Sequence, residues 1–445
     1  MEPPTRRWGP LRPHPVQLAY RHSPHRFNTV PAGRRSGKTE LAKRKLLCRA
    51  GAVPKFGNPH FFAAAPTREQ AERIYWQDLK DLTPVLLRSR RPSETDLVIR
   101  MINGAQIHVF GMDKPERIEG SPWDGGVLDE YANMKPMAWS ANIRPALADR
   151  QGWCDLIGVP EGRNHYYETD LAARAAMRGA GDASEWGSFH WVSADILPEA
   201  EIAAARRDLD PLTFAQEYEA SFLNFAGRAY YPFTESRHCA PLRWDPRQPL
   251  VFCFDFNVAP GVAVVVQEQR LPNGQTGTGI IGEVHIPNNS NTPAVCRKLL
   301  ADWGGHEGPV RCYGDATGGA RGSSRVEGSD WDLVRAELRP HFRDRLFVKV
   351  PDVNPPERAR LNAVNARLVS SDGTIRLMVD PERARNMVKD LDGVRLLTGG
   401  AGEIDKRADE RLSHLSDALG YYLVAEFPLE TKKPVRSTIL PFMAR

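Results

Sequence analysis

The chain has 445 residues, of which 41% are hydrophobic and 26% are charged. This is ordinary for a globular protein but long for a single hydrophobic core, so we expect two domains. No apolar run approaches the roughly 18–20 residues that span a bilayer, and the N-terminal sequence MEPPTRRWGP lacks the apolar core of a signal peptide. These features exclude a membrane-spanning protein and predict a cytoplasmic one.

The six cysteines form no C-x-x-C pair and lie near no histidine cluster. This spacing argues against a zinc site and against a disulfide framework, so we expect reduced and mostly buried thiols.

The net charge of +5 is unevenly distributed, because residues 1–50 carry +10 and the remainder carries −5. A polyanionic partner near the N-terminal domain would explain the excess. The alternative is that these arginines serve nucleotide phosphates or a solvated face, and charge alone does not distinguish the two.

Residues 27–39, FNTVPAGRRSGKT, join a short apolar run to a helical pattern and are typical of a phosphate-binding loop. Glycines let the backbone approach phosphates, Lys38 can reach the terminal phosphates and Thr39 can ligate magnesium. Ala32 stands where the common pattern has its first glycine. The loop residues assigned to nucleotide binding are Gly33, Arg34, Arg35, Ser36, Gly37, Lys38 and Thr39. Gln17 lies upstream at the distance where helicase-like ATPases place an adenine-reading glutamine, although a single glutamine is usually polar surface.

Helix and strand patterns alternate after this loop. They predict helices at 41–50 and 71–86, and strands at 60–65, 97–102, 105–110, 154–159 and 189–193. Asn103-Gly104 between two of these strands favours a type I′ hairpin turn. The alternation predicts a parallel α/β sheet that binds nucleotide at the carboxyl ends of its strands.

A further apolar strand, 125–128, ends in Asp129 and Glu130. In a phosphate-loop ATPase, Asp129 would hold magnesium directly or through water, and Glu130 would polarise the attacking water. An ordinary surface turn is the alternative, and the strand and helix units between Lys38 and this pair favour the catalytic interpretation.

The second half of the chain has a different pattern. Residues 198–223 are helical, and 224–249 are rich in proline, arginine and aromatic residues, so we divide the chain into a domain at 1–223, a linker at 224–249 and a domain at 250–445. Three consecutive strands at 250–257, 261–269 and 279–287 predict an antiparallel meander. Alternating helices and strands then follow at 292–303, 310–314, 331–342, 346–350, 357–369, 375–379 and 412–426. This order is that of an RNase H-like domain.

Acidic residues occupy the three places where that fold carries them. Asp255 lies in the first strand, Asp315 ends the fourth, and Asp417 lies in the last helix with His414 on the same face. A carboxylate inside an apolar strand is costly unless it is paired or bound to metal. Clustered aspartates can hold two divalent ions about 3.5–4 Å apart, which activate water and stabilise the leaving oxygen of a phosphodiester. The alternative is three unrelated aspartates that cap helices or lie on the surface.

With both sets of residues the chain resembles the large terminase subunit of tailed bacteriophages, a DNA-packaging motor. The marks that carry the resemblance span residues 17–423: the loop AGRRSGKT, the segment APTREQA, the Asp129-Glu130 pair, PEGRNHYYE, FAQEYEASF and the three aspartates. PEGRNHYYE resembles the family's coupling motif, but Gly158 and Val159 stand before its proline where Ser or Thr is usual.

This resemblance implies a phosphate-loop ATPase domain followed by an RNase H-like nuclease domain, with ATP and Mg²⁺ at the first site and Mg²⁺ or Mn²⁺ at the second. It implies ATP-driven movement of double-stranded DNA into a procapsid and cutting of concatemeric DNA. The implied partners are double-stranded DNA, the portal protein, the small terminase subunit and further copies in a ring, in the host cytoplasm and not in the mature virion. Arg117 in ERIEG matches an arginine that acts across subunits, and Arg34 and Arg35 are alternatives within the subunit.

Two other function classes stay open from the sequence. One is a nucleotide-regulated DNA-binding module whose RNase H-like domain is degenerate, and the other is a transposase-type or repair-type nuclease coupled to an ATPase. A motor predicts that DNA stimulates ATP turnover, whereas a regulated binder predicts that ATP changes DNA affinity without multiple turnovers.

Overall fold

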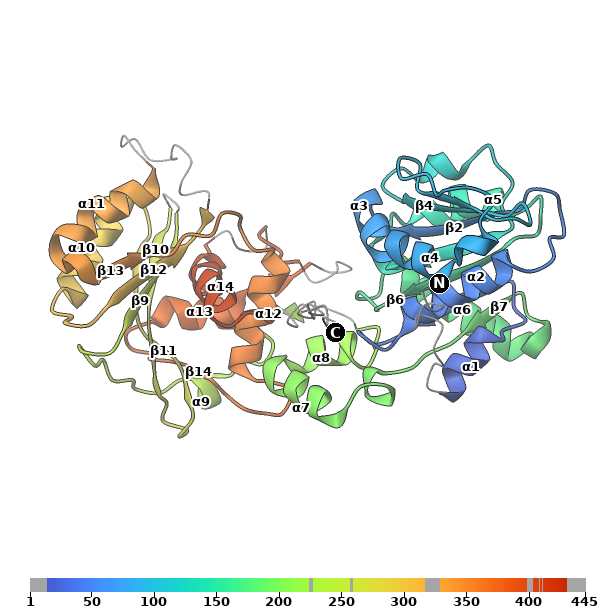
Figure 1. Ribbon diagram of the computed structural model, residues 1–445. Helices are drawn as coiled ribbons and strands as arrows, with labels where there is room; N and C mark the ends of the chain where they lie inside the picture. Colours follow the sequence, from blue (N-terminus) through green and yellow to red (C-terminus); the bar gives the residue numbers. More distant parts are fainter. Residues whose placement is uncertain are drawn as a thin grey trace, which may run out of the picture. The chain divides into compact units, whose positions relative to one another are not determined.

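The computed structural model describes residues 14–223, 227–256, 259–316, 329–397, 403–407, 409 and 411–429 (Figure 1). The chain contacts divide it into two compact units. The first unit runs to residue 223, except that Arg206–Pro211 belongs to the second unit, which contains the described residues from 227 onward. Within the described part of the chain, no helix combines the length and the apolar character needed to cross a bilayer.

A seven-stranded sheet forms the core of the first unit, with strand order β3-β4-β2-β5-β6-β1-β7. All neighbouring strands pair in parallel except β3 and β4, which are antiparallel. The strands are β1 Phe27–Pro31, β2 His60–Ala65, β3 Val98–Arg100, β4 Gln106–Gly111, β5 Gly125–Asp129, β6 Trp153–Gly158 and β7 Trp186–Ser188. The predicted mainly parallel α/β sheet is therefore confirmed.

Helices precede, connect and follow these strands in the chain. They are α1 Pro15–Arg21, α2 Lys38–Ala50, α3 Arg68–Ala71, α4 Gln77–Leu82, α5 Arg144–Ala146, α6 His165–Ala180, α7 Glu199–Asp208 and α8 Pro211–Glu217. A π-helical turn, Glu72–Trp76, joins α3 to α4. The predicted helix at 71–86 is too long, because Thr83 is extended and Pro84 follows it. Leu86 is consequently 88% exposed instead of packed in the core.

Two further local predictions are wrong. The hairpin between β3 and β4 is not a type I′ turn: only Gly104 has a positive φ, and the Gly104 N–H donates to the Met101 carbonyl at 3.1 Å. A three-residue loop that ends in a left-handed glycine therefore makes the turn. The last strand of this sheet lies at 186–188 and not at 189–193, where Trp191 makes an isolated bridge to Ala32.

The second unit has a six-stranded sheet with strand order β13-β12-β9-β10-β11-β14. The strands β9 Leu250–Asp255, β10 Gly261–Arg270 and β11 Thr276–Ile286 form the predicted antiparallel meander. The other strands are β12 Val310–Gly314, β13 Leu346–Val348 and β14 Leu377–Val379, and each pairs in parallel with its neighbour. This arrangement confirms the RNase H-like order.

The helices of the second unit are α9 Glu235–His238, α10 Thr292–Trp303, α11 Asp330–Phe342, α12 Glu357–Leu368, α13 Arg385–Gly393 and α14 His414–Glu426. The sequence patterns did not predict α13. They also did not predict the small sheet in which β8 (Gly227–Arg228) pairs with β15 (Arg395–Leu396). The segment expected to be a linker thus contributes β8 and α9 to the second unit.

Each unit buries apolar side chains in a hydrophobic core of its own. In the first unit, Val30, Leu46 and Ile107 are fully buried in one cluster, and in the second unit Phe252 and Val265 are fully buried in another. All six cysteines are free thiols and four of them are buried, as expected.

Candidate nucleotide and metal sites

The phosphate-loop sequence connects β1 to α2, and Gly37, with a φ of +84°, caps the helix. Gly33 has no room for a side chain, because a Cβ there would lie 2.6 Å from the Ser193 nitrogen and 2.5 Å from the Tyr218 oxygen. Ala32 is fully buried, and its N–H donates to the Gly158 carbonyl at 3.1 Å. The fold therefore requires glycine at 33 and accepts alanine at 32, which explains the shifted pattern.

The back of the loop is braced by two buried side chains. The Gln17 amide donates to the Ser36 carbonyl at 2.8 Å, and the Trp191 indole N–H donates to Ser36 Oγ at 2.9 Å. Ser36 Oγ in turn donates to the Gly33 carbonyl at 2.6 Å. Gln17 thus supports the loop directly, and its adenine-reading role stays a prediction.

The predicted magnesium and water-activating residues meet at the carboxyl ends of β1 and β5. Thr39 Oγ1 donates to Asp129 Oδ2 at 2.8 Å, and the Tyr75 hydroxyl donates to the same oxygen at 3.0 Å. Asp129 is only 1% exposed. A hydroxyl beside a carboxylate is an oxygen donor set that suits Mg²⁺.

Glu130 follows this strand in the left-handed conformation, with a φ of 54°. Burial raises the pKa of the Glu130 carboxyl, while Lys38 lowers it and Asp129 raises it further. A carboxylate with a raised pKa next to Lys38 of the phosphate-loop sequence suits a group that orients and deprotonates water.

The three candidate arginines lie in different surroundings. Arg34 Nε pairs with Glu217 of α8 at 2.5 Å, and the Arg34 N–H also donates to the Glu217 carbonyl. Arg35 is exposed. Arg117 is exposed on the turn Pro115–Ile118 and forms no ion pair with any described carboxylate. The action of Arg117 across subunits stays a prediction.

Helix α8 also contacts the segment that resembles a coupling motif. The Gly162 N–H donates to Gln216 Oε1 at 3.1 Å. Gln216 and Glu217 are adjacent residues, so one helix touches both the phosphate loop and residues 160–168. Sequence reasoning recognised FAQEYEASF only as a mark of the family and missed these two contacts.

Several N-terminal cations pair with carboxylates inside the first unit. Lys43 pairs with Asp78 at 2.7 Å, and Lys45 pairs with the fully buried Asp155 at 3.1 Å. Much of the positive charge at residues 14–50 is therefore neutralised within the unit. Neither interpretation from the sequence, a polyanionic partner or arginines that serve nucleotide phosphates or a solvated face, had included these ion pairs.

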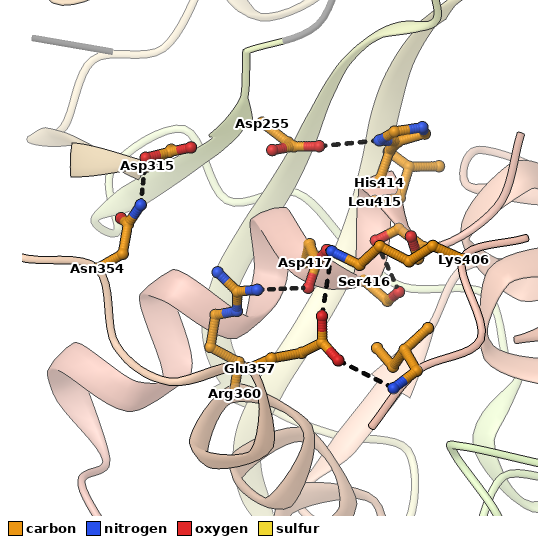
Figure 2. Close-up of polar contacts among 12 residues, drawn as sticks. Asp255, Asp315, Asn354, Glu357, Arg360, Lys406, His414, Leu415, Ser416 and Asp417 are labelled. Atoms are coloured by element: carbon orange, nitrogen blue, oxygen red, sulfur yellow. Dashed lines mark hydrogen bonds and ion pairs between the residues drawn. The ribbon is translucent and has the colours of Figure 1, made fainter. Parts of the chain in front are cut away.

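In the second unit, two of the three predicted metal-binding aspartates lie side by side. Gly314 of β12 pairs with Phe254 of β9 in parallel register, so Asp315 and Asp255 come next on adjacent strands. His414 Nδ1 lies 3.0 Å from Asp255 Oδ2, and the Asn354 amide donates to Asp315 Oδ1 at 2.6 Å (Figure 2).

The third aspartate, Asp417, is paired with cations. Asp417 Oδ1 lies 3.1 Å from Arg360, and Oδ2 lies 3.6 Å from Lys406 (Figure 2). Burial raises the pKa of Asp417, and the two cations oppose this effect. Lys406 also pairs with Glu357 at 3.1 Å.

This geometry fits a divalent ion only in part. Carboxylate oxygens are the ligands that Mg²⁺ and Mn²⁺ prefer, and Asp255 and Asp315 are adjacent. Among the described residues, however, no three His, Cys, Asp or Glu side chains are arranged to hold a metal ion. Asp417 engages Arg360 and Lys406, and the binding of two divalent ions by Asp255, Asp315 and Asp417 stays a prediction.

Asn354, Arg360 and Lys406 were not predicted as site residues. Asn354 lies between β13 and α12, and Lys406 lies in a short segment after β15. Neither belongs to a periodic pattern or a motif, so only the fold brings them to the aspartates.

Comparison with known proteins agrees with this architecture. Residues 30–237 match the family described as "Terminase large subunit, T4likevirus-type, N-terminal". The large terminase subunit of Thermus phage G20c is 29% identical over 248 residues, which cover 49% of this chain and 50% of that protein. The match therefore spans about half the length of this relative.

Solved structures extend the similarity in fold. The large terminase of a thermophilic bacteriophage has a TM-score of 0.60 at 14% identity, covering 93% of this chain and 99% of that chain. The same phage protein in complex with ATP-gamma-S has a TM-score of 0.57 at 15% identity, covering 92% and 98%. The family match of residues 30–237 agrees with the resemblance to phage large terminases that the sequence motifs carry, and the solved structures show the same fold.

Proposed function

We propose that this protein, whose residues 30–237 match the family of phage large terminase subunits, is an ATP-driven motor that moves double-stranded DNA into a procapsid. The observation that carries the proposal is the contact of Thr39 with the buried Asp129, next to Glu130 and Lys38. The similar terminase from the thermophilic bacteriophage was solved in complex with ATP-gamma-S, which supports nucleotide binding by this fold.

Different residues of the first unit would have different roles in ATP hydrolysis. Lys38 and the N–H groups of the first turn of α2 bind phosphate oxygens. Thr39 and Asp129 would hold Mg²⁺, which screens the phosphate charge. Glu130 holds the attacking water and accepts its proton, for which its raised pKa suits it.

The second unit would cut concatemeric DNA. Asp255, Asp315 and Asp417 would hold Mg²⁺ or Mn²⁺, which activates water for attack on the phosphodiester. His414 and Asn354 hold two of these carboxylates in position. As a packaging motor the protein would work in the host cell with DNA, a portal protein, a small terminase subunit and further copies of itself in a ring.

ATP turnover measured with and without double-stranded DNA tests the motor. We expect DNA to stimulate turnover, and we expect Glu130→Gln to abolish it while the variant still binds ATP, because Lys38 and the loop are intact. Glu69→Gln, which removes an acidic group from the exposed start of α3, is the matched control. Unchanged turnover by Glu130→Gln would refute the assignment.

A second candidate is a DNA-binding ATPase whose RNase H-like unit has no nuclease activity. The pairing of Asp417 with Arg360 and Lys406 favours it. Cleavage of a DNA duplex in Mg²⁺ or Mn²⁺ separates the candidates. A nuclease loses cleavage in Asp315→Asn and keeps its ATP turnover, whereas a degenerate unit leaves the duplex intact in every variant.

A further inference from the structure

A cavity of about 360 Å³ adjoins the aspartates of the second unit. Pro260 and Val262 from the meander form part of its wall, and α13 and the start of α14 form another part. His414 lines this cavity and also contacts Asp255. His414 is therefore shared by the cavity and the candidate metal site.

The lining of the cavity carries two cations and two carboxylates, and the two histidines add to its polar groups. His285, Lys389, Arg411 and His414 line it together with Asp390 and Asp409. Asp409 pairs with Arg411 at 2.8 Å.

Asp390 is committed to capping α14. It is 2% exposed and accepts hydrogen bonds from the N–H groups of Leu415 and Ser416 at 3.0 and 3.1 Å. Lys389, the exposed neighbour of Asp390 in α13, forms no ion pair with a carboxylate in the described ranges. The charge available to a ligand is thus that of Lys389, with His285 and Asn386 as further polar groups.

We propose that this cavity binds a phosphate group of the DNA strand next to the cleavage position, with Lys389 as the principal contact. Its size matches ligand pockets of about 300–1,000 Å³, and the apolar side chains of Pro260 and Val262 suit a sugar or a base. This inference rests on the proposed nuclease only for the position of the bound strand. It assigns to α13 a direct role in holding DNA.

Binding of a short fluorescent duplex to the full chain in EDTA tests the proposal without any cleavage. Lys389→Ala should weaken binding about three- to tenfold and lower the slope of log affinity against log salt by about one. Lys389→Glu should weaken binding further. The matched controls are Lys298→Ala and Lys298→Glu on α10, whose lysine is also exposed and lies outside the cavity.

Equal binding and equal salt slopes for the Lys389 and Lys298 variants would overturn the proposal. Inorganic phosphate and AMP serve as competitors that separate the sources of the ligand. If the cavity is a DNA subsite, the difference in duplex affinity between the wild type and Lys389→Ala persists in the presence of either competitor. If a low concentration of AMP removes that difference, the cavity is a mononucleotide site instead.

Failure of the nuclease assignment gives a different result. A chain that never cuts DNA but shows the Lys389 effect in EDTA retains the binding subsite and loses only the proposed cleavage. Where the chain cuts DNA, Lys389→Ala should raise KM by the same factor as the dissociation constant and leave kcat within about twofold, because Lys389 contacts the strand and not the reacting phosphate.

Discussion

Replacing Lys406 by alanine should strengthen divalent metal binding in the second unit. The Lys406 ammonium lies 3.6 Å from Asp417 Oδ2, and Arg360 lies 3.1 Å from Oδ1. A metal ion at the aspartates needs these same carboxylate oxygens. The lysine therefore competes with the metal, and removing it lowers the cost of metal binding.

The size of the effect follows from the exposure of the lysine. Two unit charges 3.6 Å apart interact by about 1 kcal/mol in bulk water and about 5 kcal/mol at an effective dielectric constant of about 20. Because the Lys406 side chain is 55% exposed, the pair belongs near the lower value, about 0.5–1 kcal/mol. The dissociation constant for Mn²⁺ should then fall about two- to fivefold.

Calorimetric titration of Mn²⁺ into the nucleotide-free chain measures this change, and Asp315→Asn identifies the heat that comes from the aspartates. The matched control is Lys349→Ala, since Lys349 is 48% exposed and pairs with Glu426 at 3.0 Å away from Asp417. Unchanged or weaker Mn²⁺ binding in Lys406→Ala, with the control at the wild-type value, would refute the competition.

Three further predictions concern stability and nucleotide binding. Burial raises the pKa of Asp390 to about 6 from an ordinary 3.8. The contribution of Asp390 to stability is therefore greatest below about pH 4 and is lost as the pH rises through about 6, a difference of up to about 3 kcal/mol. Urea unfolding should detect this pH dependence in the wild type and not in Asp390→Asn. Lys45→Met leaves Asp155 buried without its cation and should lower the free energy of unfolding by about 3–5 kcal/mol. An unchanged thermal unfolding curve would contradict this expectation. Glu217→Gln removes the carboxylate that holds Arg34 and should tighten ATP binding about two- to fivefold, whereas weaker binding would mean that Glu217 prepares Arg34 for the phosphates.

The sequence predicted the strands that end in the candidate site residues, because burial and the proposed chemistry act on the same positions. Asp129 and Asp255 each end an apolar strand, where a carboxylate is costly unless a partner compensates it. Their strands were therefore recognised as hydrophobic runs, and the two aspartates were recognised as candidate site residues because they interrupt those runs. The order of these strands along the chain then predicted both sheets.

Contacts between distant segments could not be predicted in this way. Asn354 and Lys406 lie in segments without periodicity, and they meet Asp315 and Asp417 only because the sheet order brings those segments together. The turn at Gly104 was misjudged for a related reason. Its loop contains three residues rather than two, and strand register decides that length.

Helix α8 connects the two parts of the first unit that nucleotide binding would couple. Glu217 holds Arg34 of the phosphate loop, and the adjacent Gln216 holds the Gly162 N–H. Gln216 is fully buried, and its Nε2 has no hydrogen-bond partner among the described residues. An unpaired buried donor costs about 1–3 kcal/mol, so a displacement of α8 that paired it would recover that energy. Phosphates that draw Arg34 away from Glu217 would act on this same helix, which would make α8 the element through which the state of the loop reaches residues 160–168.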